Sequence, residues 1–204
     1  MINDVPITLD FRSADKAREW AECAMSVRPW RAEFFTAFAN VIGSARGSQQ
    51  CRVLELGSGP GFLAERLLKA TDVTYVAVDF SAAMHELARQ RLGELAARVQ
   101  FIERSLLSPQ WGDGLGEFNF AVTHQAVHEL RHKRYAPALH AQVRQLLLPG
   151  GGYLVCDHFY GEGGMSNAEL YMTVDEQREA LLGAGFTQVE QVLLKGGLVL
   201  HHAT

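Results

Sequence analysis

The segment Val53-Leu54-Glu55-Leu56-Gly57-Ser58-Gly59-Pro60-Gly61 carries the main fold signal of this chain. Its apolar half predicts a buried strand, and glycines then follow at every second position from 57 to 61. Glycine lets the backbone turn sharply and approach a ligand without a Cβ in the way, and the N–H groups at the start of the next helix are free to face that ligand. The segment therefore predicts a strand, a ligand-binding loop and a helix.

Two residues of this region indicate which ligand the loop binds. A dinucleotide-binding loop of the form G-x-G-x-x-G needs glycine at position 62, where this chain has Phe62. The carboxylate of Glu55, at the end of the strand, repels a pyrophosphate but attracts an ammonium or sulfonium group. The segment favours a ligand with a cationic end, and an ordinary glycine-rich turn without a ligand is the alternative.

A second acidic residue, Asp79, ends the next apolar segment at residues 73–78. An acid about 20 positions past a glycine loop, at the tip of the second strand, is placed to accept hydrogen bonds from both hydroxyls of a ribose. Ser81 follows as a candidate helix N-cap, so Asp79 can alternatively be a helix-terminal acid that the helix dipole stabilises. Asp79 indicates a nucleoside ligand without choosing between nucleoside cofactors.

Apolar periodicity predicts a regular alternation of helices and strands along the chain. This rhythm is typical of right-handed crossovers and a parallel sheet, and the turn Lys195-Gly196-Gly197 between the last two strands predicts an antiparallel hairpin. We expect strands at about 51–56, 73–78, 99–103, 118–123, 152–157, 187–194 and 197–202. Between them we expect helices at about 61–70, 81–92 and 134–148. We also expect two amphipathic helices before the first strand and a helix that begins at the capping box Thr173-x-x-Glu176.

Composition restricts the class of protein. The chain has 204 residues, of which 48% are hydrophobic, which is enough for the core of one ordinary domain. A net charge of −4 gives no electrostatic footprint for nucleic acid or an anionic membrane. No apolar run is long enough to span a bilayer, and the start Met1-Ile2-Asn3-Asp4 lacks a signal-peptide pattern, so we expect a cytoplasmic protein. Cys23, Cys51 and Cys156 are too far apart to predict a disulfide framework or a C-x-x-C metal site.

The glycine loop with its flanking acids resembles the cofactor loop of class I S-adenosylmethionine (SAM)-dependent methyltransferases. The resemblance extends over nearly the whole chain, because the turns Leu148-Pro149-Gly150-Gly151 and Gly183-Ala184-Gly185-Phe186 are landmarks before strands five and six of that family. It implies an α/β fold with a Rossmann-like, seven-stranded, mostly parallel sheet, an antiparallel terminal hairpin and helices on both faces. It also implies one domain over residues 1–204, with residues 1–50 as a helical cap over the cofactor and substrate site.

The resemblance implies a set of SAM-binding residues. The methionine end is expected at the glycine loop, the ribose at Asp79, and the adenine near strands two and three. The family often has Asp after strand three where this chain has Ser105, whose hydroxyl can accept the same hydrogen bond without charge assistance. The expected cofactor residues are Glu55, Gly57, Ser58, Gly59, Gly61, Asp79, Phe80, Met84, Ser105, Leu106 and His124.

The segment His128-Glu129-Leu130-Arg131-His132 spells H-E-x-x-H, the zinc motif of metalloproteases. Basic residues crowd it at Arg131, Lys133 and Arg134, and no third ligand follows at a familiar spacing. The segment also follows strand four, where the methyltransferase interpretation places the substrate-facing loop. We therefore interpret the match as coincidental and expect no metal.

Methyl transfer mainly requires that the acceptor be held in line with the S–CH₃ bond and that water be excluded, and a base is needed only if the acceptor must lose a proton. The residues after strand four, Thr123 to Ala126, lack the [DN]-P-P-[YF] sequence of nucleobase amino methyltransferases. The predicted acceptor is therefore a small molecule rather than nucleic acid. The candidate bases at the strand ends are, in order, His128, His124 and His158.

Further hypotheses concern the amino-terminal helices and the function class. Arg28 and Arg31 flank Trp30 and can bind a carboxylate of the substrate or of the cofactor, or can form a solvated helix edge with Trp30 in the core. A SAM-binding protein without turnover is an alternative from another function class, and an NAD-linked oxidoreductase is a further one. The acceptor and the oligomeric state do not follow from the sequence.

Overall fold

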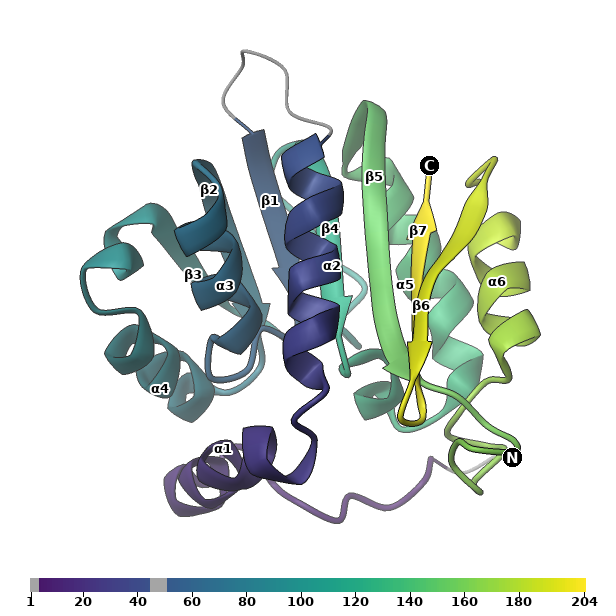
Figure 1. Ribbon diagram of the computed structural model, residues 1–204, viewed down its shortest axis with the longest axis horizontal. Coiled ribbons are helices and arrows are strands. Elements are labelled where there is room, and N and C mark those ends of the chain that lie inside the picture. Colours follow the sequence, from purple (N-terminus) through teal and green to yellow (C-terminus); the bar gives the residue numbers. More distant parts are fainter. Residues whose placement is uncertain (1–3, 45–50) are drawn as a thin grey trace.

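The computed structural model describes residues 4–44 and 51–204, in which seven strands form one sheet with the order β3-β2-β1-β4-β5-β7-β6 (Figure 1). The strands are β1 Cys51–Leu56, β2 Val73–Asp79, β3 Val99–Glu103, β4 Phe118–His124, β5 Leu147–His158, β6 Val189–Lys195 and β7 Leu198–Ala203. The helices are α1 Ala14–Val27, α2 Arg31–Ser44, α3 Phe62–Ala70, α4 Ala82–Leu92, α5 Ala136–Gln145 and α6 Val174–Gly183, with short 3-10 turns η1 Gly93–Arg98, η2 Val127–Leu130 and η3 Lys133–Tyr135.

The strand directions confirm the predicted fold class. Strands β3, β2, β1, β4 and β5 pair in parallel, whereas β7 pairs antiparallel with both β5 and β6. The strand order reverses between β1 and β4, and open α/β sheets bind their ligands at the carboxyl end of such a reversal. The glycine loop after β1 and the residues after β4 lie at this point.

The sheet is covered on both faces because its central strands are apolar on both sides. Val53 packs with α2 and α3 on one face, while Leu54 and Leu56 pack with α5 and α6 on the other. Side chains alternate across a strand, so neighbouring residues of β1 enter different halves of the core. These two layers fix the ends of β1, β2, β4 and β5 relative to one another.

Helix caps place the residues that surround the site. The Ser81 hydroxyl accepts a hydrogen bond from the backbone N–H of Met84 at 3.1 Å, so Ser81 is the N-cap of α4, as predicted. The predicted capping box of α6 is also confirmed, with Thr173 and Glu176 bonded reciprocally.

The turn expected before strand five differs from the prediction. The helix α5 ends at Gln145 rather than near 148, and β5 begins at Leu147 instead of near 152. Leu147 already pairs with Phe118, and the register then shifts before Phe120 pairs with Gly152. A Cβ on Gly151 would lie 2.9 Å from the carbonyl oxygen of Asn119, so glycine allows this bulged part of β5 to stay against β4.

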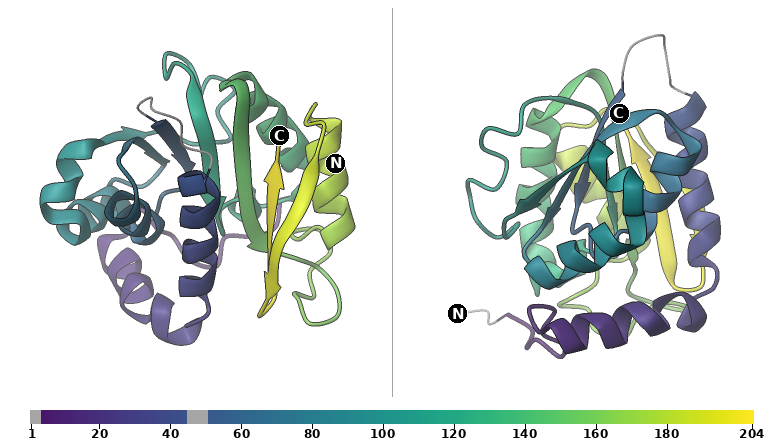
Figure 2. Two further views of the ribbon diagram at one scale, coloured as in Figure 1. Left: turned by 45° about the horizontal axis from the view of Figure 1, so that its top comes forward. Right: turned by 90° about the vertical axis from the view of Figure 1, so that its left-hand side faces the viewer.

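The amino-terminal residues lie across the carboxyl edge of the sheet. Figure 2 shows α1 below the strand ends, and the segment before α1 runs along the same edge. The backbone N–H of Val5 donates to the carbonyl of Arg131 at 2.8 Å, and the Ser81 hydroxyl donates to the carbonyl of Phe11 at 2.5 Å. Within the expected cap, residues 1–3 and 45–50 lie outside the described residues. None of the helices in the described ranges has the length and apolar character needed to cross a membrane.

The glycine loop yields a stability prediction with a matched control. Gly57 and Gly59 have φ of 64° and 52°, and a Cβ on Gly57 would overlap the Cβ of Ala126, whereas a Cβ on Gly59 meets no atom of the protein within 4 Å. Gly57→Ala should cost about 2–4 kcal/mol from overpacking and left-handed strain, and Gly59→Ala about 1–2 kcal/mol from strain alone. Urea unfolding measures both, and equal losses would contradict the close approach of Gly57 to Ala126.

Candidate active site at the carboxyl edge of the sheet

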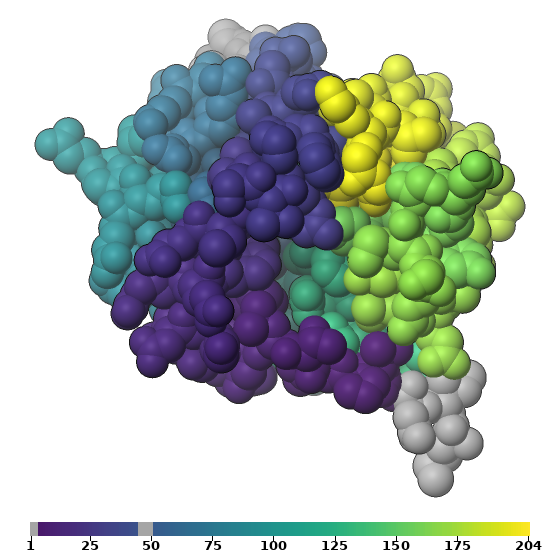
Figure 3. Space-filling view, turned by 60° about the horizontal axis from the view of Figure 1, so that its bottom comes forward, coloured from purple at the N-terminus to yellow at the C-terminus, as the bar shows by residue number. Residues whose placement is uncertain are grey.

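A cavity of about 240 Å³ lies at the point where the strand order reverses. Its wall combines the ends of β1, β2, β4 and β5 with residues 7–12 and with α1 and α2. Figure 3 shows the surface hollowed between the amino-terminal residues, in purple, and the green residues that follow β5. Every predicted site residue except Gly61 lines this cavity: Glu55, Gly57, Ser58, Gly59, Asp79, Phe80, Met84, Ser105, Leu106, His124, His128 and His158.

Gly61 has a different place in the structure. It is the N-cap of α3 with φ of 80°, and a Cβ there would lie 3.1 Å from the Cβ of Ala88 in α4. Gly61 therefore allows α3 and α4 to pack closely, which is a packing requirement of the glycine loop rather than a contact with the cavity.

The glycine loop is tied to β2 and open to the cavity. The backbone N–H groups of Gly57 and Ser58 both donate to the carbonyl of Val78, at 2.8 and 3.1 Å. The next N–H, that of Gly59, donates to Asp79 Oδ2 at 2.8 Å. The Ser58 hydroxyl is buried and has no hydrogen-bond partner among the described residues. The loop thus presents an unsatisfied polar atom and open space beside Gly59 at the place predicted for the methionine end of SAM.

Asp79 has a structural role that includes, and goes beyond, the helix-terminal acid considered from the sequence. Its two carboxylate oxygens accept hydrogen bonds from Gly59 N–H and, at 2.9 Å, from Ser81 N–H. Burial raises the pKa of Asp79, and these backbone donors lower it in part. The carboxylate holds the glycine loop against the start of α4, and each oxygen keeps a lone pair for a further donor.

Glu55 is a buried acid in the cavity wall. Its Oε2 accepts a hydrogen bond from the Tyr75 hydroxyl at 3.1 Å. Burial raises the pKa of Glu55 well above its ordinary value, so the charged form needs a cation nearby. An ammonium or sulfonium group bound at the glycine loop supplies such a cation, and the site therefore fits SAM.

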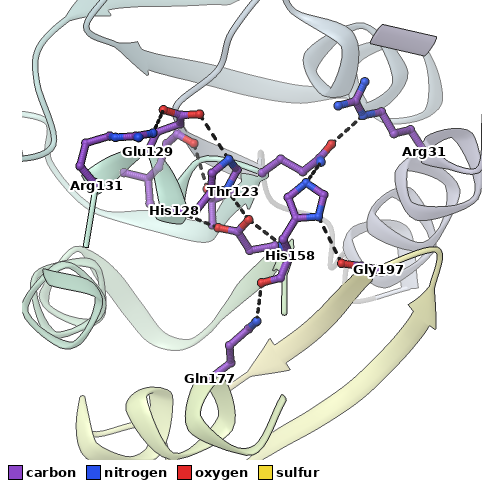
Figure 4. A network of polar contacts seen from close by, with 11 residues as sticks. Arg31, Thr123, His128, Glu129, Arg131, His158, Gln177 and Gly197 are labelled. Atoms are coloured by element: carbon purple, nitrogen blue, oxygen red, sulfur yellow. Dashed lines mark hydrogen bonds and ion pairs between the residues drawn. The ribbon is translucent and has the colours of Figure 1, made fainter. Parts of the chain in front are cut away.

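The main charged cluster of the cavity joins the ends of β4 and β5 (Figure 4). The His128 Nδ1–H donates to Asp157 Oδ1 at 2.6 Å, and the backbone N–H of His128 donates to Asp157 Oδ2 at 2.9 Å. The backbone N–H of His158 also donates to Asp157 Oδ1, at 2.7 Å. On its other side, His128 Nε2 lies 3.3 Å from Glu129 Oε1, and Arg131 lies 3.4 Å from the second oxygen of Glu129.

This cluster determines the charge of His128. Burial lowers the pKa of His128, but the charges and hydrogen bonds of Asp157 and Glu129 outweigh it and raise the pKa to about 10. The same contacts with His128 lower the pKa of Asp157 in spite of its burial. At neutral pH the cavity therefore holds an imidazolium between two carboxylates.

The other two candidate bases differ from His128. His124 lies among Phe34, Phe35 and Phe38, and burial lowers its pKa to about 3. Burial also lowers the pKa of His158 to about 4. Both histidines are neutral at neutral pH, and only His128 is oriented by a carboxylate on one ring nitrogen while the other faces the cavity side.

The H-E-x-x-H segment does not form a zincin helix. The 3-10 turn η2 ends at Leu130, and Arg131 has a left-handed φ of 69°. His132 Nδ1 accepts a hydrogen bond from the backbone N–H of Arg134 at 3.1 Å, while His128 points to Asp157. In residues 4–44 and 51–204 no group of three or more His, Cys, Asp or Glu side chains is arranged to hold a metal ion.

Sequence reasoning missed Gln125, which joins the amino-terminal helices to this cluster. Its Oε1 accepts from Arg31 Nε at 2.6 Å and its Nε2 donates to His158 Nε2 at 2.7 Å. Its φ of 57° is unusual for a residue other than glycine, and nothing in the sequence signals it. Arg28 and Arg31 line the cavity, whereas Trp30 packs against the apolar core.

Residues 53–151 match the family described as methyltransferase domain. This segment is a methyltransferase domain. The match begins within β1, includes the glycine loop and ends within β5, so it assigns the loop to a methyltransferase rather than to an NAD-linked oxidoreductase. The match agrees with the predicted methyltransferase family over residues 53–151 of the chain.

Relatives of the methyltransferase domain include parts of larger proteins. Fumosorinone synthetase from Cordyceps fumosorosea (strain ARSEF 2679) is 31% identical over 123 residues, which cover 57% of this chain and 3% of the synthetase. The chain thus spans a small fraction of the length of this curated relative.

Solved structures share the fold at low sequence identity. An O-methyltransferase family protein from Burkholderia thailandensis superposes with a TM-score of 0.73 and 20% identity over 95% of this chain and 61% of its own. The DhpI-SAM-HEP complex superposes with a TM-score of 0.69 and 19% identity, over 95% of this chain and 94% of that chain. Both likenesses confirm the methyltransferase fold.

The buried carboxylate of Asp157 yields a stability prediction. Both of its oxygens accept N–H groups, so the amide nitrogen of Asp157→Asn must face a donor in either orientation. We expect a loss of about 3–5 kcal/mol in the free energy of unfolding, as for a broken buried ion pair. The control is Asp72→Asn, because Asp72 pairs with Arg98 at 3.5 Å while 89% exposed, and it should change stability by less than about 0.5 kcal/mol. Similar stability of the two variants in urea would rule out the buried pair.

Proposed function

We propose that this protein transfers a methyl group from SAM to a small-molecule acceptor. The observation that carries the proposal is that one cavity is lined both by the glycine loop with Asp79 and by His128, whose Nδ1–H is bonded to Asp157 behind the cavity wall. The proposed cofactor site and the proposed base thereby share one cavity. The net charge of −4 supports a small-molecule acceptor over nucleic acid. The same proposal includes one domain over residues 1–204, with residues 1–50 as a cap, and a cytoplasmic location.

The cavity residues divide between the two halves of a SAM molecule. Glu55, Ser58 and Gly59 hold the methionine end, and Asp79 accepts from the ribose hydroxyls. The adenine lies among Phe80, Met84, Ser105 and Leu106, which line the cavity near the ends of β2 and β3. When bound, SAM supplies a methyl group activated by its positively charged sulfur.

His128 is the proposed base for an acceptor hydroxyl. Asp157 holds Nδ1 protonated, so Nε2 is the nitrogen that takes the acceptor proton once Glu129 has moved from it. The pKa of about 10 keeps His128 protonated in the free protein. A cation bound in the same cavity lowers this pKa, because like charges oppose each other, and this shift favours the neutral imidazole that a base requires.

One observation favours SAM binding without turnover as a second function. An imidazolium held between Asp157 and Glu129 cannot accept a proton. In this state the site is therefore better suited to binding a charged ligand than to removing a proton from an acceptor. The two functions differ in whether SAM is consumed, and incubation with a metabolite library distinguishes them by the release of S-adenosylhomocysteine.

The ribose contact predicts the effect of removing Asp79. Asp79→Ala should weaken SAM binding by about 1.5–3 kcal/mol, or about 10- to 150-fold in Kd, because charge-assisted hydrogen bonds to the sugar are lost. Calorimetry on the folded variant measures this change. Asp72→Ala, at the exposed end that precedes β2, serves as the control and should bind SAM as the wild type does. An unchanged Kd in folded Asp79→Ala would remove Asp79 from the cofactor site.

The proposed base predicts a separate effect on turnover. His128→Ala should reduce kcat by about 100-fold or more while the Kd for SAM stays the same, as for the loss of a general base. His132→Asn is the matched control, because it removes the second histidine of H-E-x-x-H but keeps a side-chain acceptor for the N–H of Arg134. Full activity in alanine variants of His128, His124 and His158 would mean that the acceptor is already nucleophilic, such as an amine or thiol.

A further inference from the structure

Arg31 is a buried cation in the wall of the cavity. Its exposed fraction is 3%, and its guanidinium donates to the carbonyl of Ala24 at 2.5 Å and to Gln125 Oε1 at 2.6 Å. It also lies over the ring of Trp20, with 5.4 Å from Cζ to the ring centre. All of these partners are neutral, so the guanidinium of Arg31 is hydrogen-bonded but no negative charge among them balances it.

Arg28 lines the same cavity, and its side chain makes no hydrogen bond or ion pair with the described residues. The other arginines of the cavity differ from this pair, because Arg12 lies 3.8 Å from Asp10 and Arg131 lies 3.4 Å from Glu129. Within residues 4–44 and 51–204, neither Arg28 nor Arg31 is paired with an acidic side chain.

Two unbalanced cations in one wall are costly for the protein alone. Burial and the charge of Arg28 lower the pKa of Arg31 to about 10, which shows that its charged form is disfavoured. A buried charge is normally paired, since its desolvation costs several kcal/mol. An anion bound between Arg28 and Arg31 would restore this balance.

The pair lies on the acceptor side of the cavity. Arg31 contacts Gln125, which contacts His158, and the ring of His158 lies 5.3 Å from that of His128 (Figure 4). Arg28 and His158, the last residue of β5, line the same cavity, and the charge of Arg28 contributes to lowering the pKa of His158. The cofactor acids Glu55 and Asp79 end β1 and β2 instead.

We propose that Arg28 and Arg31 form a subsite for a carboxylate group of the methyl acceptor. A guanidinium fork matches the planar geometry of a carboxylate, and the rings of Trp20 and Phe35 line the adjoining wall for the apolar body of the acceptor. The acceptor is thus an organic acid in its anionic form, with the atom to be methylated placed near His128. This inference rests on the proposed function for the identity of the acceptor site.

The test uses pairs of ligands that differ in charge but not in shape. Benzoate and benzamide form an aromatic pair, and hexanoate and hexanamide an aliphatic one, each titrated into protein saturated with S-adenosylhomocysteine. In at least one pair the carboxylate should bind at least about tenfold more tightly than its amide. Arg28→Gln should remove this preference, and it should fold because Arg28 makes no side-chain hydrogen bond to the described residues. Arg12→Gln, which changes an arginine paired with Asp10, should retain it.

Three results would overturn the subsite. The first is equal affinity for carboxylate and amide in both pairs, and the second is tighter binding of methylphosphonate than of any carboxylate. The third is that Arg28→Gln binds S-adenosylhomocysteine more weakly but binds 5′-methylthioadenosine, which lacks the methionine carboxylate, as the wild type does. Arg28 would then bind the carboxylate of the cofactor instead of the acceptor. Failure of the wild type to bind S-adenosylhomocysteine would instead contradict the proposed function, and the same ligand pairs titrated into the free protein would still test the subsite.

Discussion

The hydrogen bonding of one buried carboxylate, that of Asp157, determines the geometry of the site. An unpaired carboxylate at this depth would cost several kcal/mol, so the chain around it is arranged to supply donors. The backbone N–H groups of His128 and His158 and the imidazole of His128 all point at it, which fixes the loops that leave β4 and β5. The same contacts turn the other ring nitrogen of His128 toward Glu129 in the cavity wall, so fold stability and site geometry depend on one interaction.

Charge is distributed unevenly around the cavity, and this distribution gives each half a different ligand preference. The ends of β1 and β2 contribute Glu55 and Asp79, whose buried carboxyls favour a cation and hydroxyl donors. The junction of α1 and α2 contributes Arg28 and Arg31 without acidic partners among the described residues. His128 lies between these halves. The negative charges of Asp157 and Glu129 raise its pKa, and a bound cation would lower it.

Local signals in the sequence were sufficient to predict most of the fold. Apolar periodicity located the strands, and the caps at Ser81 and Thr173 were predicted because a cap depends on residues three positions apart. The contact between His128 and Asp157 joins residues 29 positions apart, and the one between Arg31 and Gln125 joins residues 94 apart, so no local pattern reveals them. The packing role of Gly61 was missed for the same reason, because Ala88 approaches it only after α3 and α4 have packed.

The most direct test of the account is the protonation of His128, observed by the ¹⁵N chemical shifts of its ring nitrogens. In the free protein at about pH 8, both nitrogens should carry protons, although an ordinary histidine with a pKa of about 6.5 would be neutral. In Asp157→Asn the ring should be neutral at the same pH, because the main opposing charge is gone. A neutral His128 in the wild type at about pH 8 would contradict the claim that the buried Asp157 carboxylate controls the site.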